Sequence, residues 1–238
     1  MAEYKEIHGT NIETVASDPS NPVVGQVWYN STSQALKGSA LTAAAWATSN
    51  AMNTVRDALG GSGADKDGAL AFGGGSSPSN ATANNESYNG TSWTEVGDLN
   101  TSKRDFEGAG VSTTAALAFG GMSNPDPTVS ATNESWNGSS WTEVGDLNTG
   151  RRGIGGAGTS TAALGFGGNQ DGPSSGVTET WNGTSWTEVG DLNTSRSNTA
   201  GAGANNTAVL AANGSTTESW NGSSWTEVND LNTPRSNL

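Results

Sequence analysis

The chain contains no cysteine and a single histidine, His8, among its 238 residues. Without thiols, disulfide bridges, thiolate metal sites and cysteine nucleophiles are excluded. No apolar run approaches the roughly 18 residues of a membrane-spanning helix, and the first residues, MAEYKEIHGTN, lack the apolar segment of a secretory signal peptide. We therefore expect no signal peptide and no membrane partner.

Apolar and positively charged residues are also scarce. Hydrophobic residues make up 32% of the chain, and the formal net charge is −13. The acidic balance opposes binding to phosphate groups, so we expect no nucleic-acid partner. Such a composition is typical of disordered chains. The 34 glycines and nine tryptophans recur at regular positions, however, which favours a folded chain with thin apolar layers.

One phrase occurs four times with nearly the same letters. Its copies read ESYNGTSWTEVGDLN (86–100), ESWNGSSWTEVGDLN (134–148), ETWNGTSWTEVGDLN (179–193) and ESWNGSSWTEVNDLN (218–232). Their closing tryptophans, Trp93, Trp141, Trp186 and Trp225, are 48, 45 and 39 residues apart. This period indicates stacked copies of one supersecondary unit, typically a four-stranded propeller blade.

Each repeat contains the signals for four strands. A glycine-rich stretch such as 108–110 is followed by an apolar run ending in two glycines, ALAFGG at 116–121. Short apolar runs bounded by glycine are typical of buried strands. Asn137-Gly138 then predicts a two-residue hairpin turn between the ESW and SWTEV strands. We expect an all-β chain of four-stranded antiparallel blades.

The repeat count predicts a five-bladed propeller, because Trp46 is also followed by Asn53-Thr54 at the spacing seen in the other copies. The predicted blades cover about 23–52 with 233–238, 53–99, 100–147, 148–192 and 193–232. In this prediction the C-terminal strand completes the first blade and closes the ring; alternatively, it pairs with another subunit. Residues 1–22 form an N-terminal arm, either a strap across the propeller or an anchor on a partner.

The repeats resemble those of kelch propellers, which place a diglycine, two aromatic positions and a basic residue in the order of Gly120-Gly121, Trp136, Trp141 and Arg151. The stretch DPSNPVVGQVWYNSTSQALKG (18–38) resembles the opening of kelch-like virion proteins of tailed bacteriophages, especially marine ones. This resemblance implies a virion surface protein, made in the host cytoplasm, that serves as a tail adhesin, a tail-fibre component or a capsid decoration. Other virion proteins are its expected partners, through the arm, and a homo-oligomer is compatible with it.

One position of the repeat carries half of the basic residues of the chain. These are Arg56, Lys103, Arg151, Arg196 and Arg235. Their place between blades predicts a ring near the channel mouth, which would bind an anionic sugar through charge-assisted hydrogen bonds. Alternatively, they pair with the repeated aspartates Asp98, Asp146, Asp191 and Asp230.

No pattern indicates catalysis, a metal or a cofactor. The repeated glutamates Glu95, Glu143, Glu188 and Glu227 share one environment, so nothing distinguishes an acid from a base as glycoside hydrolysis requires. We expect a protein that is not an enzyme.

The segments after the diglycines differ between copies, and variable loops on a rigid scaffold favour recognition. The predicted binding residues there are Asn80, Asn84, Asn124, Asp126, Asn169 and Asp171. A host-surface glycan is the ligand we expect. A second class of function is a carbohydrate-binding lectin, in which Tyr88, Trp136, Trp181 and Trp220 stack on sugars.

Overall fold

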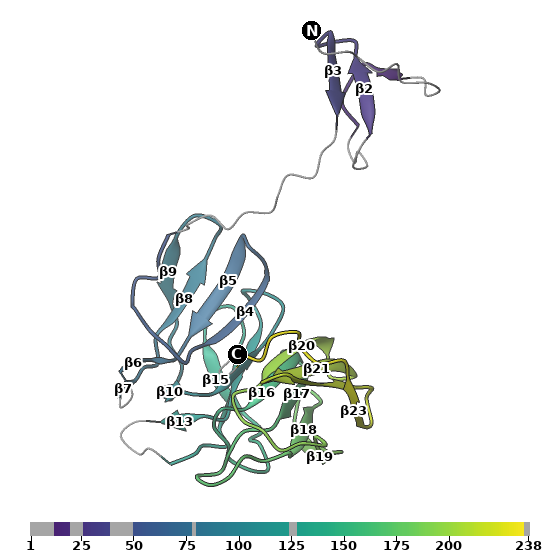
Figure 1. The fold of residues 1–238 in the computed structure, drawn as a ribbon. Coiled ribbons are helices and arrows are strands. Elements are labelled where there is room, and N and C mark those ends of the chain that lie inside the picture. The colour runs from purple at the N-terminus through teal and green to yellow at the C-terminus, as the bar shows by residue number, and fades with distance from the viewer. Residues whose placement is uncertain (1–11, 20–25, 39–49, 78–79, 124–127, 236–238) are drawn as a thin grey trace. The chain divides into compact units, whose positions relative to one another are not determined.

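The computed structural model describes residues 12–19, 26–38, 50–77, 80–123 and 128–235, which divide between two compact units, Met1–Thr48 and Ser49–Leu238. Within these described ranges, the regular secondary structure consists of β-strands, without any helix (Figure 1). None of the described residues forms a helix that is long and apolar enough to cross a membrane. The predicted all-β class is confirmed.

The smaller unit contains one three-stranded sheet. Its strands are β1 (Glu13–Val15), β2 (Val27–Asn30) and β3 (Ala35–Gly38). β1 pairs in parallel with β2, and β2 pairs antiparallel with β3. This pairing joins the predicted arm to strands that we expected in the first blade.

The carboxylate of Asp18 holds this small sheet together. It accepts hydrogen bonds from Trp28 Nε1 at 3.0 Å, Asn30 Nδ2 at 2.7 Å and Lys37 Nζ at 2.6 Å. Because Lys37 and these other donors favour the ionised form, the pKa of Asp18 is lowered to about 2. Four positions of one short segment are therefore linked through a single side chain.

The sequence predicted a boundary between residues 22 and 23, whereas the two compact units meet between Thr48 and Ser49. Residues 27–30 and 35–38, within the predicted first blade, are strands. Residues 27–30 pair with both 13–15 and 35–38, in a three-stranded sheet and not in a four-stranded blade. The predicted copy around Trp46 and the end of the predicted closing strand, 236–238, lie outside the described residues.

The larger unit contains four four-stranded antiparallel sheets, numbered here 1 to 4 along the chain. Sheet 1 has β4 (Gly60–Asp65), β5 (Gly68–Phe72), β8 (Asn85–Tyr88) and β9 (Trp93–Val96). Sheet 2 has β11 (Glu107–Ala109), β12 (Ala116–Phe119), β14 (Asn133–Trp136) and β15 (Trp141–Val144). Sheet 3 has β16 (Gly155–Thr159), β17 (Ala162–Phe166), β18 (Thr178–Trp181) and β19 (Trp186–Val189). Sheet 4 has β20 (Ala200–Asn205), β21 (Ala208–Asn213), β22 (Thr216–Trp220) and β23 (Trp225–Val228).

Four short strands do not belong to these four-stranded sheets. β6 (Gly75–Ser77) pairs with β7 (Asn80–Ala81), and β10 (Lys103–Arg104) pairs with β13 (Met122–Ser123). They belong to the segments that follow the diglycines and to the linker that enters sheet 2.

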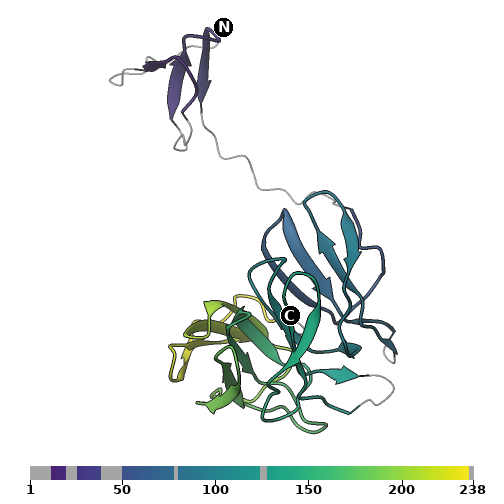
Figure 2. The ribbon, with the colours of Figure 1, turned by 180° about the vertical axis from the view of Figure 1, so that it is seen from behind.

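The sheets are arranged in chain order around their innermost strands, with β4 beside β11, β11 beside β16 and β16 beside β20. Glycine permits this close approach, because a Cβ atom on Gly201 would lie 2.0 Å from the carbonyl oxygen of Gly156. Figure 2 shows the four sheets from behind, fanning out from these strands. The arrangement is a β-propeller-like fold, with four four-stranded sheets in the described residues.

The apolar core consists of three layers, one between each pair of neighbouring sheets. In each layer, a phenylalanine of one sheet contacts the second tryptophan of the next: Phe72 and Trp141 at 4.8 Å, Phe119 and Trp186 at 4.8 Å, and Phe166 and Trp225 at 5.0 Å between ring centroids. Such pairs contribute about 0.5–1.5 kcal/mol each beyond the area they bury.

The hairpin turn differs from the predicted two-residue turn. Trp136 is paired directly with Trp141, so the loop has four residues. The side-chain oxygen of Asn137 accepts the backbone N–H groups of Ser139 and Ser140 at 2.9 and 3.0 Å, which satisfies both donors within the loop. The Asn-Gly signal correctly placed the turn but not its length.

Candidate functional site

Four of the five repeated basic side chains are buried. Arg56, Lys103, Arg151 and Arg196 are 7%, 1%, 0% and 6% exposed. Each faces a glutamate in the third strand of the sheet that follows it: Glu86, Glu134, Glu179 and Glu218, respectively. An external anion cannot reach these cations, so the predicted anion-binding ring is wrong for these four positions. The alternative pairing with aspartates is wrong as well.

Arg151 shows how such a site is built. Its Nη1 donates to the carbonyl oxygens of Gly167 and Val177 at 2.7 and 2.6 Å, and its Nη2 donates to Glu179 Oε1 at 2.9 Å. The other oxygen of Glu179 accepts the backbone N–H and the side-chain amide of Asn148, at 2.7 and 2.8 Å. Burial lowers the pKa of Arg151, and Glu179 opposes this effect. The buried ion pair and these additional hydrogen bonds therefore attach the linker residues 148–151 to sheet 3, which follows them in the chain.

Three of the repeated aspartates bind backbone N–H groups and not the basic side chains. The carboxylates of Asp98, Asp146 and Asp191 accept the backbone N–H of the residue that opens the third strand of the same sheet, at 3.1–3.2 Å. Asp230 is exposed. The glutamates that do pair with the cations were visible in the sequence, since each ES or ET dipeptide opens one copy of the repeated phrase.

The tryptophans predicted to stack on sugars are inside the molecule. Trp136, Trp181 and Trp220 are only 1–2% exposed, and their indole N–H groups donate to carbonyl oxygens at 3.0–3.1 Å. Because these rings face the neighbouring sheet, they are not available for stacking, and the prediction is corrected for all three. Tyr88 is partly buried against Trp93, with ring centroids 5.1 Å apart.

The predicted loop residues do not all fall in one place. Asn169 and Asp171 lie together on Arg152, whose Nε donates to Asn169 Oδ1 at 2.9 Å and is 3.9 Å from Asp171 Oδ1. Asn84 accepts a hydrogen bond from Thr82 Oγ1 at 2.6 Å, and Asn80 is exposed. Asn124 and Asp126 lie outside the described residues.

These loops border the linkers that lead into each inner strand, with Asp57 paired to Gly75 and Arg152 to Asn169. One linker residue in each copy has a positive φ: Ala58, Asp105, Gly153 and Asn198, at 50–56°. Backbone hydrogen bonds join them in a row, from Asp105 N to Ala58 O (3.2 Å), Gly153 N to Asp105 O (2.8 Å) and Asn198 N to Gly153 O (2.7 Å). The loops and this row therefore share one end of the larger unit.

A cavity of about 450 Å³, called here the mouth cavity, lies at this row. It is lined by the row itself and by the residues that follow: Ala58, Leu59, Asp105, Phe106, Glu107, Gly153, Ile154, Asn198 and Thr199. The polar members of this lining, among them Asp105, Asn198 and Thr199, were not singled out from the sequence. Asp105 and Asn198 occupy the position that Ala58 and Gly153 hold in the other copies, and Thr199 occupies the next position, held elsewhere by Leu59, Phe106 and Ile154. The signal in the sequence was therefore a change from a small or apolar residue to a polar one within the repeat.

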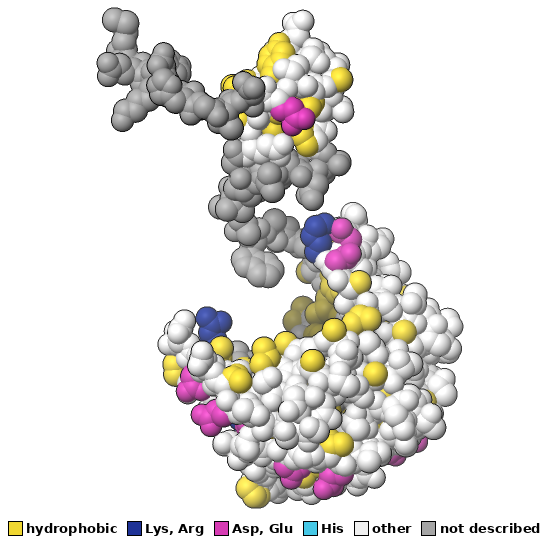
Figure 3. All heavy atoms as spheres, turned by 90° about the vertical axis from the view of Figure 1, so that its right-hand side faces the viewer, with side chains coloured by type: hydrophobic (Ala, Val, Ile, Leu, Met, Phe, Trp, Pro, Cys, Tyr) yellow, Lys and Arg dark blue, Asp and Glu magenta, His cyan; other side chains and the backbone are white. Residues whose placement is uncertain are grey.

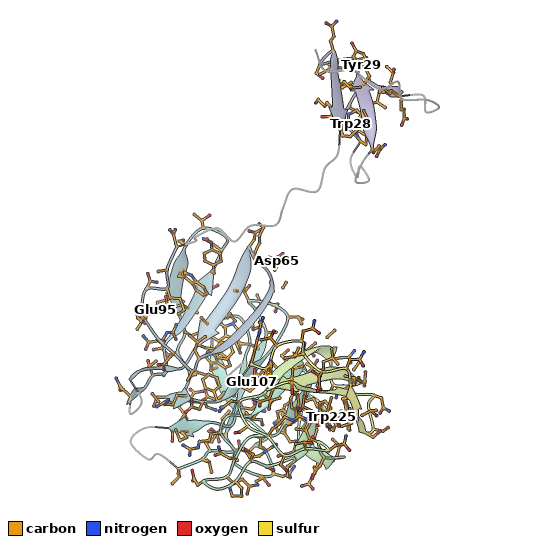
Figure 4. The ribbon with its side chains drawn as sticks, viewed as in Figure 1. Trp28, Tyr29, Asp65, Glu95, Glu107 and Trp225 are labelled. Carbon is orange, nitrogen blue, oxygen red and sulfur yellow. The ribbon has the colours of Figure 1, made fainter. Side chains whose placement is uncertain are left out.

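Glu107 breaks the repeat most clearly. It occupies the inner-strand position held by Gly60, Gly155 and Ala200 in the other copies. It lines both the mouth cavity and a smaller, glycine-lined cavity of about 200 Å³ along β11, β16 and β20. Figure 4 labels its side chain. Burial raises the pKa of Glu107 to about 8, although its bond to the N–H of Gly108, at 3.1 Å, acts in the opposite direction. Near neutral pH its carboxyl group is therefore mainly protonated and able to donate a hydrogen bond.

No metal site accompanies these groups, since the described residues contain no cluster of three His, Cys, Asp or Glu side chains able to hold an ion. What the mouth cavity offers is a concave surface with hydroxyl, amide and carboxyl groups. Concave surfaces with a few polar groups are typical of sites that bind small molecules.

Comparison with known proteins identifies the fold and nothing more specific. No protein-family model matches the sequence, and no curated protein matches it. The solved "Structure of YjhT" is similar to this chain, with a TM-score of 0.63, over 76% of this chain and 72% of that chain. At 12% sequence identity this similarity concerns the β-propeller-like fold alone.

Proposed function

We propose that this protein is a non-enzymatic surface component of a bacteriophage virion, either a tail adhesin or fibre component or a capsid decoration. The observation that carries the proposal is the division of the chain: the segment 18–38, which resembles the opening of phage virion proteins, falls within its own compact unit. In this proposal the smaller unit contacts other virion proteins, and the larger unit faces the host.

The ligand-facing part in this proposal is the end of the larger unit that carries the variable loops and the mouth cavity. The buried ion pairs and aromatic contacts hold the sheets in place, so the loops can differ without loss of the fold. Asn169, Asp171 and Arg152 form one polar cluster there. A neutral glycan of the host surface is the expected ligand class.

The ring in this proposal has five blades. A linker segment with the pattern Asn-Thr-x-Arg or Asn-Thr-x-Lys occurs five times, at 53–56, 100–103, 148–151, 193–196 and 232–235. Four of these segments lead into sheets 1 to 4, and the fifth follows sheet 4. One further blade would use it.

Electron cryomicroscopy of the intact phage particle tests the virion role. The expected result is density on the tail or capsid surface into which the larger unit fits, with the smaller unit at the particle. A complete particle map without such density, supported by the protein's absence from purified particles by mass spectrometry, would overturn the proposal.

A second candidate, a carbohydrate-binding lectin that is not part of a particle, is favoured by the mouth cavity of about 450 Å³. A glycan array would separate the two, using the wild type and the variants Asp105→Ala and Asn198→Ala. Binding that both variants abolish would support the lectin and place its site at the mouth cavity. An array without any signal would count against it.

A further inference from the structure

The fifth linker segment, Asn232–Arg235, has the groups that hold a glutamate in the other copies. In the preceding copy, the backbone N–H of Asn193 donates to Glu218 at 2.8 Å, and the guanidinium of Arg196 pairs with the same carboxylate. In three of the four completed copies the threonine N–H adds a bond, as at Thr194 (3.3 Å). Thus four separate carboxylates are bound in the same manner.

The backbone of the fifth segment already has the arrangement of the completed copies. Gly214 N donates to Arg235 O at 2.7 Å, as Gly168 N does to Arg196 O at 2.9 Å. Leu231 N donates to Ser215 O at 2.8 Å, as Leu192 N does to Gly176 O. The segment is therefore positioned by sheet 4, and no four-stranded sheet of the described ranges follows it on its other side.

Arg235 itself is exposed and forms no ion pair with any residue in the described ranges. Beside it lies a cavity of about 420 Å³, lined by Ala212, Leu231, Asn232, Thr233 and Arg235. A cation and two backbone donors thus face an open space, where each completed copy contains a carboxylate.

The sheet surface next to this segment is uncovered as well. Leu210 is 47% exposed, whereas Leu164 at the same position of sheet 3 is fully buried. Leu231 is 36% exposed, whereas Leu192 is 6% exposed. Figure 3 shows that the surface of the larger unit is hollowed on this side. An apolar face and a carboxylate-binding segment are therefore open together.

We propose that Asn232–Arg235 and the exposed face of β21 form a docking socket for a β-hairpin of the repeat's own type, with a glutamate two positions before a tryptophan. The glutamate would bind Arg235 and the two N–H groups, and the tryptophan pair would cover Leu210 and Ala212. Ala212 stands where Phe166 contacts Trp225, so this socket has more room for the incoming rings than an internal interface.

The sequence excludes two other occupants. No glutamate lies between Glu13 and Glu86, so residues 23–52 cannot supply the carboxylate. Of the nine tryptophans, only Trp136, Trp181 and Trp220 of the repeated phrase have a glutamate two positions before them. A folded second copy offers Glu86, Glu134, Glu179 and Glu218 only in pairs with their own cations. The hairpin therefore comes from outside these 238 residues. This inference shares with the proposed five-bladed ring the need for one more sheet beside sheet 4. It does not depend on the proposed virion role.

A binding experiment with a defined hairpin tests the socket. The probe is a fluorescent peptide of residues 133–144, NESWNGSSWTEV, cyclised to keep the two tryptophans paired, with a hairpin confirmed by NMR. It is titrated against the full 238-residue protein by fluorescence anisotropy. The matched control peptide carries Glu134→Gln. The protein variant is Arg235→Ala, and its control is Lys66→Ala, which removes another exposed cation.

Binding to the wild type is expected to weaken at least tenfold with either Glu134→Gln in the peptide or Arg235→Ala in the protein. Combining both changes should give little further loss, as for two groups in direct contact. Lys66→Ala should leave the affinity unchanged.

Equal affinity for the wild type and Arg235→Ala would overturn the proposal, as would no binding of the folded hairpin up to about 1 mM, a limit of weak affinity. Dimerisation of the wild type that Arg235→Ala abolishes would also overturn it, because the occupant would then be a second copy. The virion role would be untouched by any of these results.

Discussion

Sheets 3 and 4 have nearly the same outer hairpin, ETWNGTSWTEV and ESWNGSSWTEV, in the same register. Sheet 3 lies between two neighbours, and its inner strand β16 is almost wholly buried. Within the residues that the structure describes, sheet 4 shares an apolar layer with sheet 3 alone, and its inner strand β20 is mostly exposed. Burial of a given repeat position is therefore decided by the neighbouring sheet and not by the residue at that position.

The largest effect is expected from removing the cation that is buried. Arg151→Ala should lower the free energy of unfolding by about 3–5 kcal/mol, because Glu179 is left charged in the interior without its partner. Arg235→Ala, at the same position of the repeat but exposed, should change it by less than about 0.5 kcal/mol. Urea unfolding of both variants measures this difference, and equal losses would contradict the comparison.

A smaller difference is expected for the leucines of the two faces. Leu164→Ala should cost about 2–5 kcal/mol through lost burial and the cavity that remains. Leu210→Ala should cost well under 1 kcal/mol, because nearly half of its side chain already contacts solvent. Thermal unfolding followed by circular dichroism reports both values. A similar loss for Leu210→Ala would mean that another part of the protein covers this face in solution.

The pH dependence of stability should reflect Glu107, the acidic residue at a position that sheet 3 fills with Gly155. The folded-state pKa of about 8 lies above the ordinary 4.5, so the folded protein binds more protons between these values. Stability should therefore fall as pH rises from about 4.5 to about 8, by at most about 1.4 kcal/mol per pH unit.

Glu107→Gln keeps the side-chain shape and removes the titration, so it should abolish this part of the pH dependence and stabilise the protein above pH 7. Urea unfolding at pH 5, 7 and 9 provides the measurement. An unchanged slope in the variant would show that other groups cause it.

The smallest effect is expected for Lys103→Arg. Lys103 Nζ lies 3.7 Å from Glu134, while Arg151 is within 2.9 Å of Glu179. Burial lowers the pKa of Lys103 to about 8, against the influence of Glu134. A guanidinium donates in several directions at once, so the variant should gain about 1 kcal/mol. A loss in urea unfolding would indicate that the space around Lys103 is too small for an arginine.

The strands of the repeat were predictable because their signals are local. Diglycines ended the apolar strands, and Asn-Gly pairs placed the hairpin turns. The pairing of the cations was not predictable, because aspartates and glutamates repeat with the same period. Arg151 and Glu179 are 28 residues apart, and alignment along the chain does not show which carboxylate faces the guanidinium across the interface.

The division of the chain into two compact units could not be predicted from the repeat pattern either. The motif that includes Trp28 and Tyr29 was assigned to a blade because it contains strand signals, which the structure confirms (Figure 4). Its pairing partner is β1, which joins it in parallel from a segment without repeat signals. Glu107 was not predicted as a site residue because it occurs in one copy of the repeat only, and a repeat pattern indicates the positions that the copies share.

By itself, the sequence determined the all-β class, the four-stranded unit and the recurring residue types, because turn and strand preferences act over a few neighbouring residues. The tertiary structure decided which copies are covered, which carboxylate meets each cation and which repeat positions remain open. These outcomes depend on surfaces brought together from distant parts of the chain. The same Asn-Thr-x-Arg segment is therefore a closed internal joint at Arg196 and an exposed one at Arg235.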